Sequence, residues 1–286
     1  MTRERASAVI RASVMSRVAT LAVLAIGIVV FMIPLYVMAV MALKTPSDAA
    51  TSSVWALPRV VTIANFREVL GSPNVVFALL FKNTLFLAVI NTIGVVLTSA
   101  LAAYAFARLR FAGRDRLFIT LLSTMMLPGI VTLIPSYVMF AKVHWVDTFL
   151  PLTVPAFFGG GAFNIFLLRQ FFSTIPRELD EAAVIDGAGH WTIFRHIVIP
   201  LSGPALATIG VFTFIGTWRD FMGPLLYLDD ASKQTLEVGL ATYKALRDEK
   251  THLMMAASLL VMLPLIVLFL VGQRYFVKGI VMTGLK

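Results

Sequence analysis

The chain has 286 residues, of which 59% are hydrophobic and only 14% are charged. A soluble domain of this size cannot bury that much apolar surface, whereas lipid can cover it. There is no cysteine, which excludes a disulfide framework and a thiolate metal site. The net charge of +9 collects in short basic clusters at the ends of apolar runs, a pattern typical of membrane topology and not of nucleic-acid binding.

Six apolar runs predict an all-α polytopic membrane protein with six transmembrane helices. The runs lie at about 19–43, 78–107, 117–140, 149–168, 204–228 and 253–275. The first run follows four arginines and is longer than the apolar region of a signal peptide. We therefore interpret it as a first transmembrane helix, preceded by a cytoplasmic tail at 1–18.

The segment 44–77 is polar and mixed, and we predict that it lies outside the membrane on the extracytoplasmic side. Trp55 is expected to be an interfacial anchor, and residues 63–70 a short helix near the membrane surface. The remainder, 78–286, is predicted to form the core transmembrane domain.

Polar and helix-breaking residues interrupt the second, third and fourth runs. Asn83 and Asn91 lie at membrane depth, where hydrogen bonding between helices is favoured over solute contact for either one. Pro128 and Pro135 are expected to bend the third span. The run Gly159-Gly160-Gly161 in the fourth span predicts close helix approach or local unwinding.

A polar hairpin at 176–200 separates the fourth and fifth spans. Pro176 suits the first position of a helix, whose early acidic residues match the positive end of the helix dipole. Gly187 is expected to end that helix in a left-handed conformation, and a second short amphipathic helix follows. Two short helices around a glycine make a compact projection able to dock into a groove on another protein.

The fifth span contains charged residues and a Gly-Pro pair. Arg219 and Asp220 are costly in lipid, so we expect them to face the bundle interior or water. Gly223-Pro224 is expected to interrupt the helix. Our candidates for a translocation pathway or helix break are Asn83, Asn91, Trp218, Arg219, Asp220, Gly223 and Pro224.

Charge distribution orients the six spans. Fourteen of the 24 Lys and Arg residues fall in segments that this topology places in the cytoplasm, including Lys286 at the C-terminus. The resulting net charge is +8 inside and +1 outside. The positive-inside rule therefore predicts cytoplasmic N- and C-termini and a cytoplasmic hairpin.

The spacing within the hairpin resembles the EAA loop of ABC-importer permeases. Glu181-Ala182-Ala183 is followed after three residues by Gly187, and after nine more by Ile197-x-Ile199-Pro200; only Ile199 departs, where the family pattern has Leu. The resemblance implies a type I ABC-importer permease fold in which this loop couples to an ATPase subunit. The coupling residues that it implies are Glu181, Ala182, Ala183, Asp186, Gly187, Ile197 and Pro200.

The likeness covers nearly the whole chain and is closest to MalG-type carbohydrate permeases. It rests on Trp55-Ala56-Leu57-Pro58, on 103–109 with Gly113-Arg114, on 125–128 and on 235–240. It implies a bacterial-type plasma (inner) membrane importer for a sugar, oligosaccharide or polyol. The implied partners are a second, MalF-like permease, two ATPase subunits that bind ATP and Mg, and an extracytoplasmic solute-binding protein.

Two positions depart from the family pattern. Arg219 stands where an Asn is usual, and Asp147-Thr148 stands where Asn-Thr is common. Repacking of helix contacts is the favoured interpretation, and a changed preference toward an anionic or hydroxyl-rich solute such as a glycerol phosphate is the alternative.

The sequence predicts no catalysis by this chain. It has no phosphate-binding loop of the G-x-x-x-x-G-K-[ST] type, and its four histidines lack metal-ligand spacing, so no bound cofactor or metal is expected. An ion-coupled secondary transporter would need intramembrane acids, for which Asp220 is the sole candidate. A membrane-embedded enzyme would need clustered nucleophiles, bases or metal ligands at one depth, and none is visible.

Overall fold

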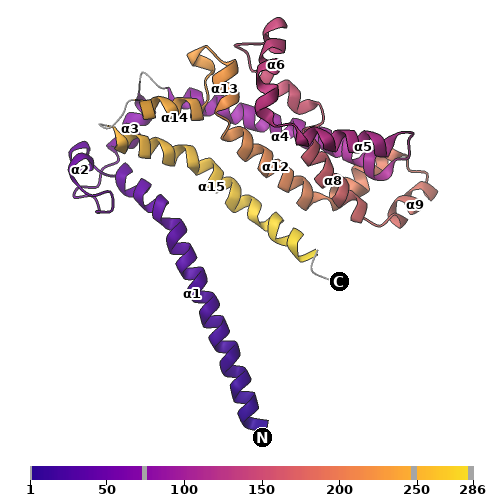
Figure 1. The fold of residues 1–286 in the computed structure, drawn as a ribbon, viewed down its shortest axis with the longest axis horizontal. Helices are drawn as coiled ribbons and strands as arrows, with labels where there is room; N and C mark the ends of the chain where they lie inside the picture. The colour runs from indigo at the N-terminus through magenta and orange to yellow at the C-terminus, as the bar shows by residue number, and fades with distance from the viewer. Residues whose placement is uncertain (1, 73–75, 246–249, 283–286) are drawn as a thin grey trace. The chain divides into compact units, whose positions relative to one another are not determined.

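The computed structural model describes residues 2–72, 76–245 and 250–282, and every regular element in these ranges is a helix (Figure 1). Within these described ranges, four helices are long and apolar enough to cross a membrane, or up to six if each of two bent helix pairs counts as one span. The predicted all-α polytopic fold is confirmed. Lys286 lies outside the described residues. The chain divides into two compact units, Met1–Leu70 with Tyr243–Leu260, and Gly71–Thr242 with Val261–Lys286.

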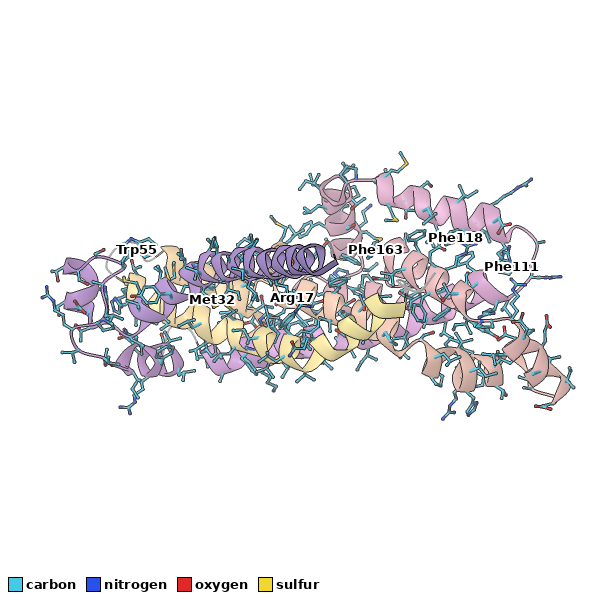
Figure 2. The ribbon with its side chains drawn as sticks, turned by 90° about the horizontal axis from the view of Figure 1, so that it is seen from below. Arg17, Met32, Trp55, Phe111, Phe118 and Phe163 are labelled. Carbon is cyan, nitrogen blue, oxygen red and sulfur yellow. The ribbon has the colours of Figure 1, made fainter. Side chains whose placement is uncertain are left out.

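In the first unit, α1 (Thr2–Ala42) is a continuous helix that includes most of the predicted N-terminal tail. The stretch Arg17–Ala42 satisfies the criteria for a membrane span and buries none of its most apolar window. Figure 2 shows Arg17 and Met32 along this helix and Trp55 in the loop after α2 (Pro46–Thr51). A helix that exposes apolar side chains all round suits lipid.

Buried polar groups order the segment after α1. Lys44 is fully buried, and its Nζ donates to Ser52 Oγ and to the Ser53 carbonyl, both at 2.7 Å. Asn65, in α3 (Ala64–Gly71), donates from Nδ2 to the carbonyls of Ala42 and Lys44 at 2.7 and 2.8 Å. These bonds satisfy carbonyls that the end of α1 leaves unpaired. The helix predicted at 63–70 is confirmed as α3.

In the second unit, α4 (Phe77–Arg108) is the central helix. Both α8 (Ala162–Thr174) and α12 (Gly203–Trp218) pack against it (Figure 1). Small residues such as Ala100, Ala103 and Ala205 are buried at these contacts, and small side chains let helix backbones approach closely.

The third predicted span is sharply bent. The helix α5 (Arg114–Ser123) continues into η1 (Thr124–Met126), and α6 (Gly129–Lys142) then departs at 98°. Leu127 is extended, with ψ 116°, because the ring of Pro128 disfavours the helical region for the residue before it. The bend predicted at Pro128 is confirmed, whereas Pro135 lies inside α6.

The fourth predicted span is divided by its glycines. The elements α7 (Leu150–Thr153) and η2 (Val154–Phe157) end before Gly159-Gly160-Gly161, where all three φ angles are positive. A Cβ on Gly160 would overlap the backbone of Val95, and Ser99 Oγ donates to the Gly159 carbonyl at 3.0 Å. The glycines therefore allow both the close approach to α4 and the local unwinding that the sequence predicted.

The fifth predicted span breaks earlier than the Gly-Pro pair suggested. The helix α12 ends at Trp218, and α13 (Met222–Tyr227) already contains Gly223 and Pro224. The break falls at 219–221, where Asp220 Oδ1 accepts a hydrogen bond from the Gly223 N–H at 3.0 Å. Proline is tolerated in the first turn of a helix, so Pro224 fits α13 without breaking it.

The chain then continues through η4 (Ala231–Lys233) and α14 (Leu236–Ala245) to the long final helix α15 (Thr251–Met282). Asp147 joins the α6–α7 loop to the segment after α13. Its Oδ2 pairs with Lys233 Nζ at 2.7 Å, and its Oδ1 accepts from the N–H groups of Asp229 and Asp230 at 3.2 and 3.0 Å. Asp147, which stands where the family pattern commonly has Asn, therefore supplies a charged partner for Lys233.

Candidate functional site

The hairpin consists of α9 (Glu178–Ile185), α10 (His190–Ile193), a π-helical turn η3 (Phe194–Val198) and α11 (Ile199–Leu201). The helix α9 begins two residues after Pro176, so the prediction of proline at the first helical position was wrong by two residues. Asp180 and Glu181 lie in the first turn of α9, as expected.

The turn between the two arms is a Schellman motif, and it explains the spacing of the alanines and the glycine. Gly187 has φ +83°, its N–H bonds the Val184 carbonyl at 3.0 Å, and the N–H of Ala188 bonds the Ala183 carbonyl at 2.8 Å. These are the two backbone bonds that define the motif. Ala183 and Ala188 also pack against the core of the second unit. The left-handed stop predicted at Gly187 is confirmed.

The C-terminal turns of α4 hold both arms of the hairpin. Arg108 pairs with Asp180 of α9 at 3.3 Å and donates from Nη2 to the carbonyls of Phe172 and Ile175, at the end of α8. Tyr104 donates to the His190 carbonyl at 3.1 Å, at the start of the second arm. Sequence reasoning used Arg108 as a topology signal and as part of the family resemblance, and Asp180 as a dipole partner, so it missed this attachment.

The second arm buries one face. Ile193, Phe194 and Val198 are buried, and Ile197 packs partly against the same core. Pro200 has no N–H to donate to the preceding turn, and the wider π-helical turn ends two residues before it, at Val198. The apolar positions at the end of the EAA pattern thus anchor the hairpin to the bundle.

The tip of the hairpin is exposed. Glu181, Ala182, Asp186 and Gly187 are all solvent-accessible, and Glu181 forms no ion pair with any described residue. Ile185 is 87% exposed. Val184 and Trp191 are exposed as well. Sequence reasoning did not single out Ile185, although an apolar residue beside the Asp-Gly turn was the available signal.

A cavity of about 390 Å³ lies at the break between α12 and α13. It brings together four of the predicted pathway residues, Asn91, Arg219, Asp220 and Pro224. The rest of its lining is Leu87, Leu152, Gly216 and Thr217. Its walls thus combine one cation, one carboxylate and one carboxamide with apolar groups.

The other predicted pathway residues have structural partners elsewhere. Asn83 donates to the carbonyls of Ser232 and Gln234 at 2.9 and 3.0 Å. Trp218 is 1% exposed and donates from Nε1 to the Val261 carbonyl at 3.1 Å. A Cβ on Gly223 would overlap the Asp220 carboxylate, so this glycine makes room for the cap of α13.

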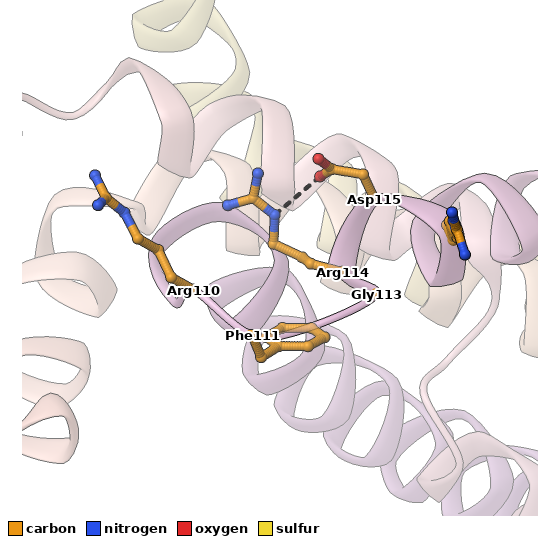
Figure 3. Close-up of a pocket in the computed structure, with 6 residues that line it drawn as sticks. Arg110, Phe111, Gly113, Arg114 and Asp115 are labelled. Carbon is orange, nitrogen blue, oxygen red and sulfur yellow. Dashed lines mark hydrogen bonds and ion pairs between the residues drawn. The ribbon is translucent and has the colours of Figure 1, made fainter.

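A second hollow, of about 540 Å³, lies at the turn between α4 and α5 (Figure 3). Its lining includes three arginines, 110, 114 and 116. Figure 3 shows the Nε of Arg114 paired with Asp115, at 2.9 Å. None of the predicted pathway or coupling residues lines this hollow. Among the described residues, no group of three His, Cys, Asp or Glu side chains is arranged to hold a metal ion.

Comparisons with known proteins agree with this architecture. Residues 94–282 match the family model of binding-protein-dependent transport system inner membrane components. The chain is 36% identical to the sn-glycerol-3-phosphate transport system permease protein UgpE of Pectobacterium atrosepticum, over 90% of this chain and 93% of the relative. It is 32% identical to the ABC transporter permease ORF2 of a Caldicellulosiruptor species, over 92% and 94% of the two chains.

The fold also matches a solved structure. A chain of a bacterial ABC transporter involved in the import of the acidic polysaccharide alginate superimposes with a TM-score of 0.81, over 93% of this chain and 98% of that chain. The sequence identity is 24%, so this likeness concerns the fold.

Proposed function

We propose that this chain, which belongs to the binding-protein-dependent transport system inner membrane components, forms half of a translocation pore and couples it to ATPase subunits through the hairpin 176–200. The family assigns it as the membrane-spanning permease subunit of an ABC importer, separate from the ATPase. An ion-coupled secondary transporter is thereby set aside.

The observation that carries the coupling role is the contrast between the base and the tip of the hairpin. The base is fixed to α4 by Arg108 and Tyr104, whereas the tip exposes Ile185 and Glu181 to a partner. Exposed apolar groups with an adjacent charge are typical of a docking surface. A projection that is rigid at its base transmits force to the helices that hold it.

The proposed mechanism is alternating access. Closure of two ATP-bound subunits pulls on the tips of the hairpins of this chain and of a second permease, and α4, α8 and α12 move with the base. The bundle then alternates between inward-open and outward-open states. ATP and Mg bind to the ATPase subunits, and an extracytoplasmic binding protein delivers the solute.

The proposed solute is a polyhydroxylated compound of the carbohydrate class. Support comes from the UgpE relative, which is named for sn-glycerol-3-phosphate, and from the polar lining of the α12–α13 cavity. A neutral sugar or polyol and an anionic sugar derivative both belong to this class. We place the cytoplasmic side of the membrane at the hairpin, with both termini on that side.

Affinity co-purification from native membranes tests the coupling role. The wild-type chain is expected to recover an ATPase subunit, a second permease and a binding protein. Ile185→Asp and Glu181→Lys should lose the ATPase and keep the second permease, because both alter only the tip. Arg116→Glu changes an exposed charge outside the hairpin and serves as the control. Retention of the ATPase by both tip variants would contradict the proposal.

A further inference from the structure

We infer that the α12–α13 cavity is a solute subsite that selects a hydroxylated anion, with Arg219 binding the carboxylate or phosphate group. This inference rests on the proposed function and deepens it. The volume of about 390 Å³ falls within the range of small-molecule pockets, roughly 300–1,000 Å³, and suits a solute of monosaccharide size.

The cation in the cavity is unpaired. Arg219 is exposed at the end of α12, and no described residue accepts a hydrogen bond from its guanidinium or lies within ion-pair distance of it. Arg219 directly follows α12, at the break within the fifth predicted span, and a cation at membrane depth is costly without a partner or water. A guanidinium binds carboxylate and phosphate through two parallel hydrogen bonds. An anionic group on the solute is the partner that this geometry lacks.

The neighbouring carboxylate of Asp220 is not the partner of the Arg219 guanidinium. Asp220 turns its Oδ1 onto the Gly223 N–H at 3.0 Å, and its carboxylate lies against Gly223 at the start of α13. The Asp220 carboxylate is therefore engaged at the break between α12 and α13, and the Arg219 guanidinium lines the cavity without a partner. The two opposite charges make the cavity suited to a solute that carries hydroxyl donors as well as an anion.

The carboxamide of Asn91 supplies a second contact. Asn91 lines the cavity and is only 8% exposed, and its Oδ1 has no hydrogen-bond partner. An unpaired buried acceptor of this kind is unfavourable. Rotation of the carboxamide would present this oxygen to a solute hydroxyl, which would satisfy it. Asn91 therefore discriminates hydroxylated anions from simple ones.

Charge-selective labelling tests the subsite without knowledge of the natural solute. Because the chain has no cysteine, Thr217→Cys places a single thiol in the cavity wall. In the purified importer complex in nanodiscs, an anionic methanethiosulfonate reagent should react with this thiol faster than a cationic one. The ratio of the two labelling rates measures the charge selectivity of the cavity. Arg219→Asn should lower that ratio about tenfold, the effect of losing one charge-assisted contact. Arg116→Asn, an exposed arginine outside the cavity, should leave the ratio unchanged.

Protection by small probes tests the ligand class. We expect sn-glycerol 3-phosphate to slow labelling at lower concentration than inorganic phosphate, and glycerol to protect least. Arg219→Asn should weaken protection by both anions, and Asn91→Leu should remove the advantage of glycerol phosphate over inorganic phosphate. Equal protection by glycerol and glycerol phosphate, or a labelling ratio unaffected by Arg219→Asn, would overturn the inference.

Two further outcomes separate this inference from its rivals. If Arg219 instead pairs with an acidic residue of a neighbouring subunit, Arg219→Asn will reduce recovery of the second permease without changing charge selectivity, and the subsite is refuted. If the wild-type chain recovers no ATPase subunit, the proposed function fails on its own, whatever the labelling ratio is.

Discussion

Arg108, at the end of α4, forms an ion pair with Asp180 in the first arm of the hairpin, with 3.3 Å between Nη1 and Oδ2. The Arg108 side chain is 3% exposed and also binds two carbonyls at the end of α8. One guanidinium therefore connects the central helix, the helix that enters the hairpin and the hairpin itself. We propose that motion of α9 reaches the bundle through this contact.

Asp180→Asn is expected to loosen the first arm of the hairpin. Loss of the carboxylate should weaken attachment by about 1–3 kcal/mol, the range for leaving a buried polar group such as the Arg108 guanidinium without its partner. Faster hydrogen exchange at the Gly187 and Ala188 amides, with α4 unaffected, would show it. Glu178→Gln removes an acid from the same turn and is the control, since Glu178 makes no ion pair with a described residue. Equal exchange in both variants would refute the attachment.

Tyr104→Phe is expected to loosen the second arm by about 1 kcal/mol, the usual contribution of one hydrogen bond. The ring remains and keeps its contact with Phe194, whose centroid lies 5.1 Å away. The loss is therefore confined to the bond to the His190 carbonyl. ATP hydrolysis stimulated by the binding protein should fall while basal hydrolysis persists. Unchanged stimulation would mean that the second arm does not need this bond.

Gly187→Ala is expected to destabilise the hairpin turn by about 1–2 kcal/mol. Residue 187 has φ +83°, in the left-handed region that is unfavourable for a residue with a Cβ. No atom lies within 4 Å of the added Cβ, so backbone strain is the whole effect. Gly189→Ala is a matched control in the same turn, with φ −80° and equally open space. Co-purification with the ATPase should decrease for the first variant alone. A similar decrease in both would indicate that the tip tolerates no added methyl group.

The Asp147–Lys233 clamp predicts a transition in acid. Two hydrogen bonds hold the pKa of Asp147 below its ordinary value. The larger contribution comes from Lys233, and the next comes from the backbone N–H of Asp230. A carboxyl whose pKa is lowered in the folded state stabilises it above the unfolded pKa, and this contribution is lost as pH falls through the folded pKa. Hence the loop should open below about pH 4, where an ordinary Asp titrates.

Tryptophan fluorescence checks this transition, because Trp145 lies in the clamped loop and stacks on Phe140 at 5.6 Å between ring centroids. The acid transition should vanish in Asp147→Asn and in Trp145→Phe. The pKa of Lys233 is raised by its hydrogen bond to Asp147, so the clamp should also be lost at strongly alkaline pH, as pH rises through that pKa. A transition that persists in Asp147→Asn would assign it to another group.

Single-cysteine labelling tests the orientation in the membrane. Ser173→Cys and Thr148→Cys replace residues next to the hairpin and in the α6–α7 loop, in a chain that contains no other cysteine. A membrane-impermeant maleimide added to intact spheroplasts should label position 148 and not position 173, and inside-out vesicles should give the reverse. Labelling of both positions from the same side would reject the six-span topology.

The sequence by itself determined the helical class, the approximate positions of the apolar runs and the form of the hairpin turn. These properties follow from local rules: hydropathy summed over a span, the steric freedom of Gly187 and the fixed ring of Pro128. Each rule acts within a few residues, so no distant contact is needed to apply it. The bend near Pro128 and the left-handed Gly187 were therefore predictable.

Only the tertiary structure decided which polar side chains share a site. Asn83 and Asn91 are two turns apart on α4, yet the first binds loop carbonyls and the second lines a cavity. Likewise, Arg108 and Asp180 become partners because α4 and α8 pack together. The helix break lies upstream of Pro224, where Asp220 accepts a hydrogen bond from the Gly223 N–H. A hydrogen bond depends on distances between atoms from remote parts of the chain, and residue spacing within one helix does not specify them.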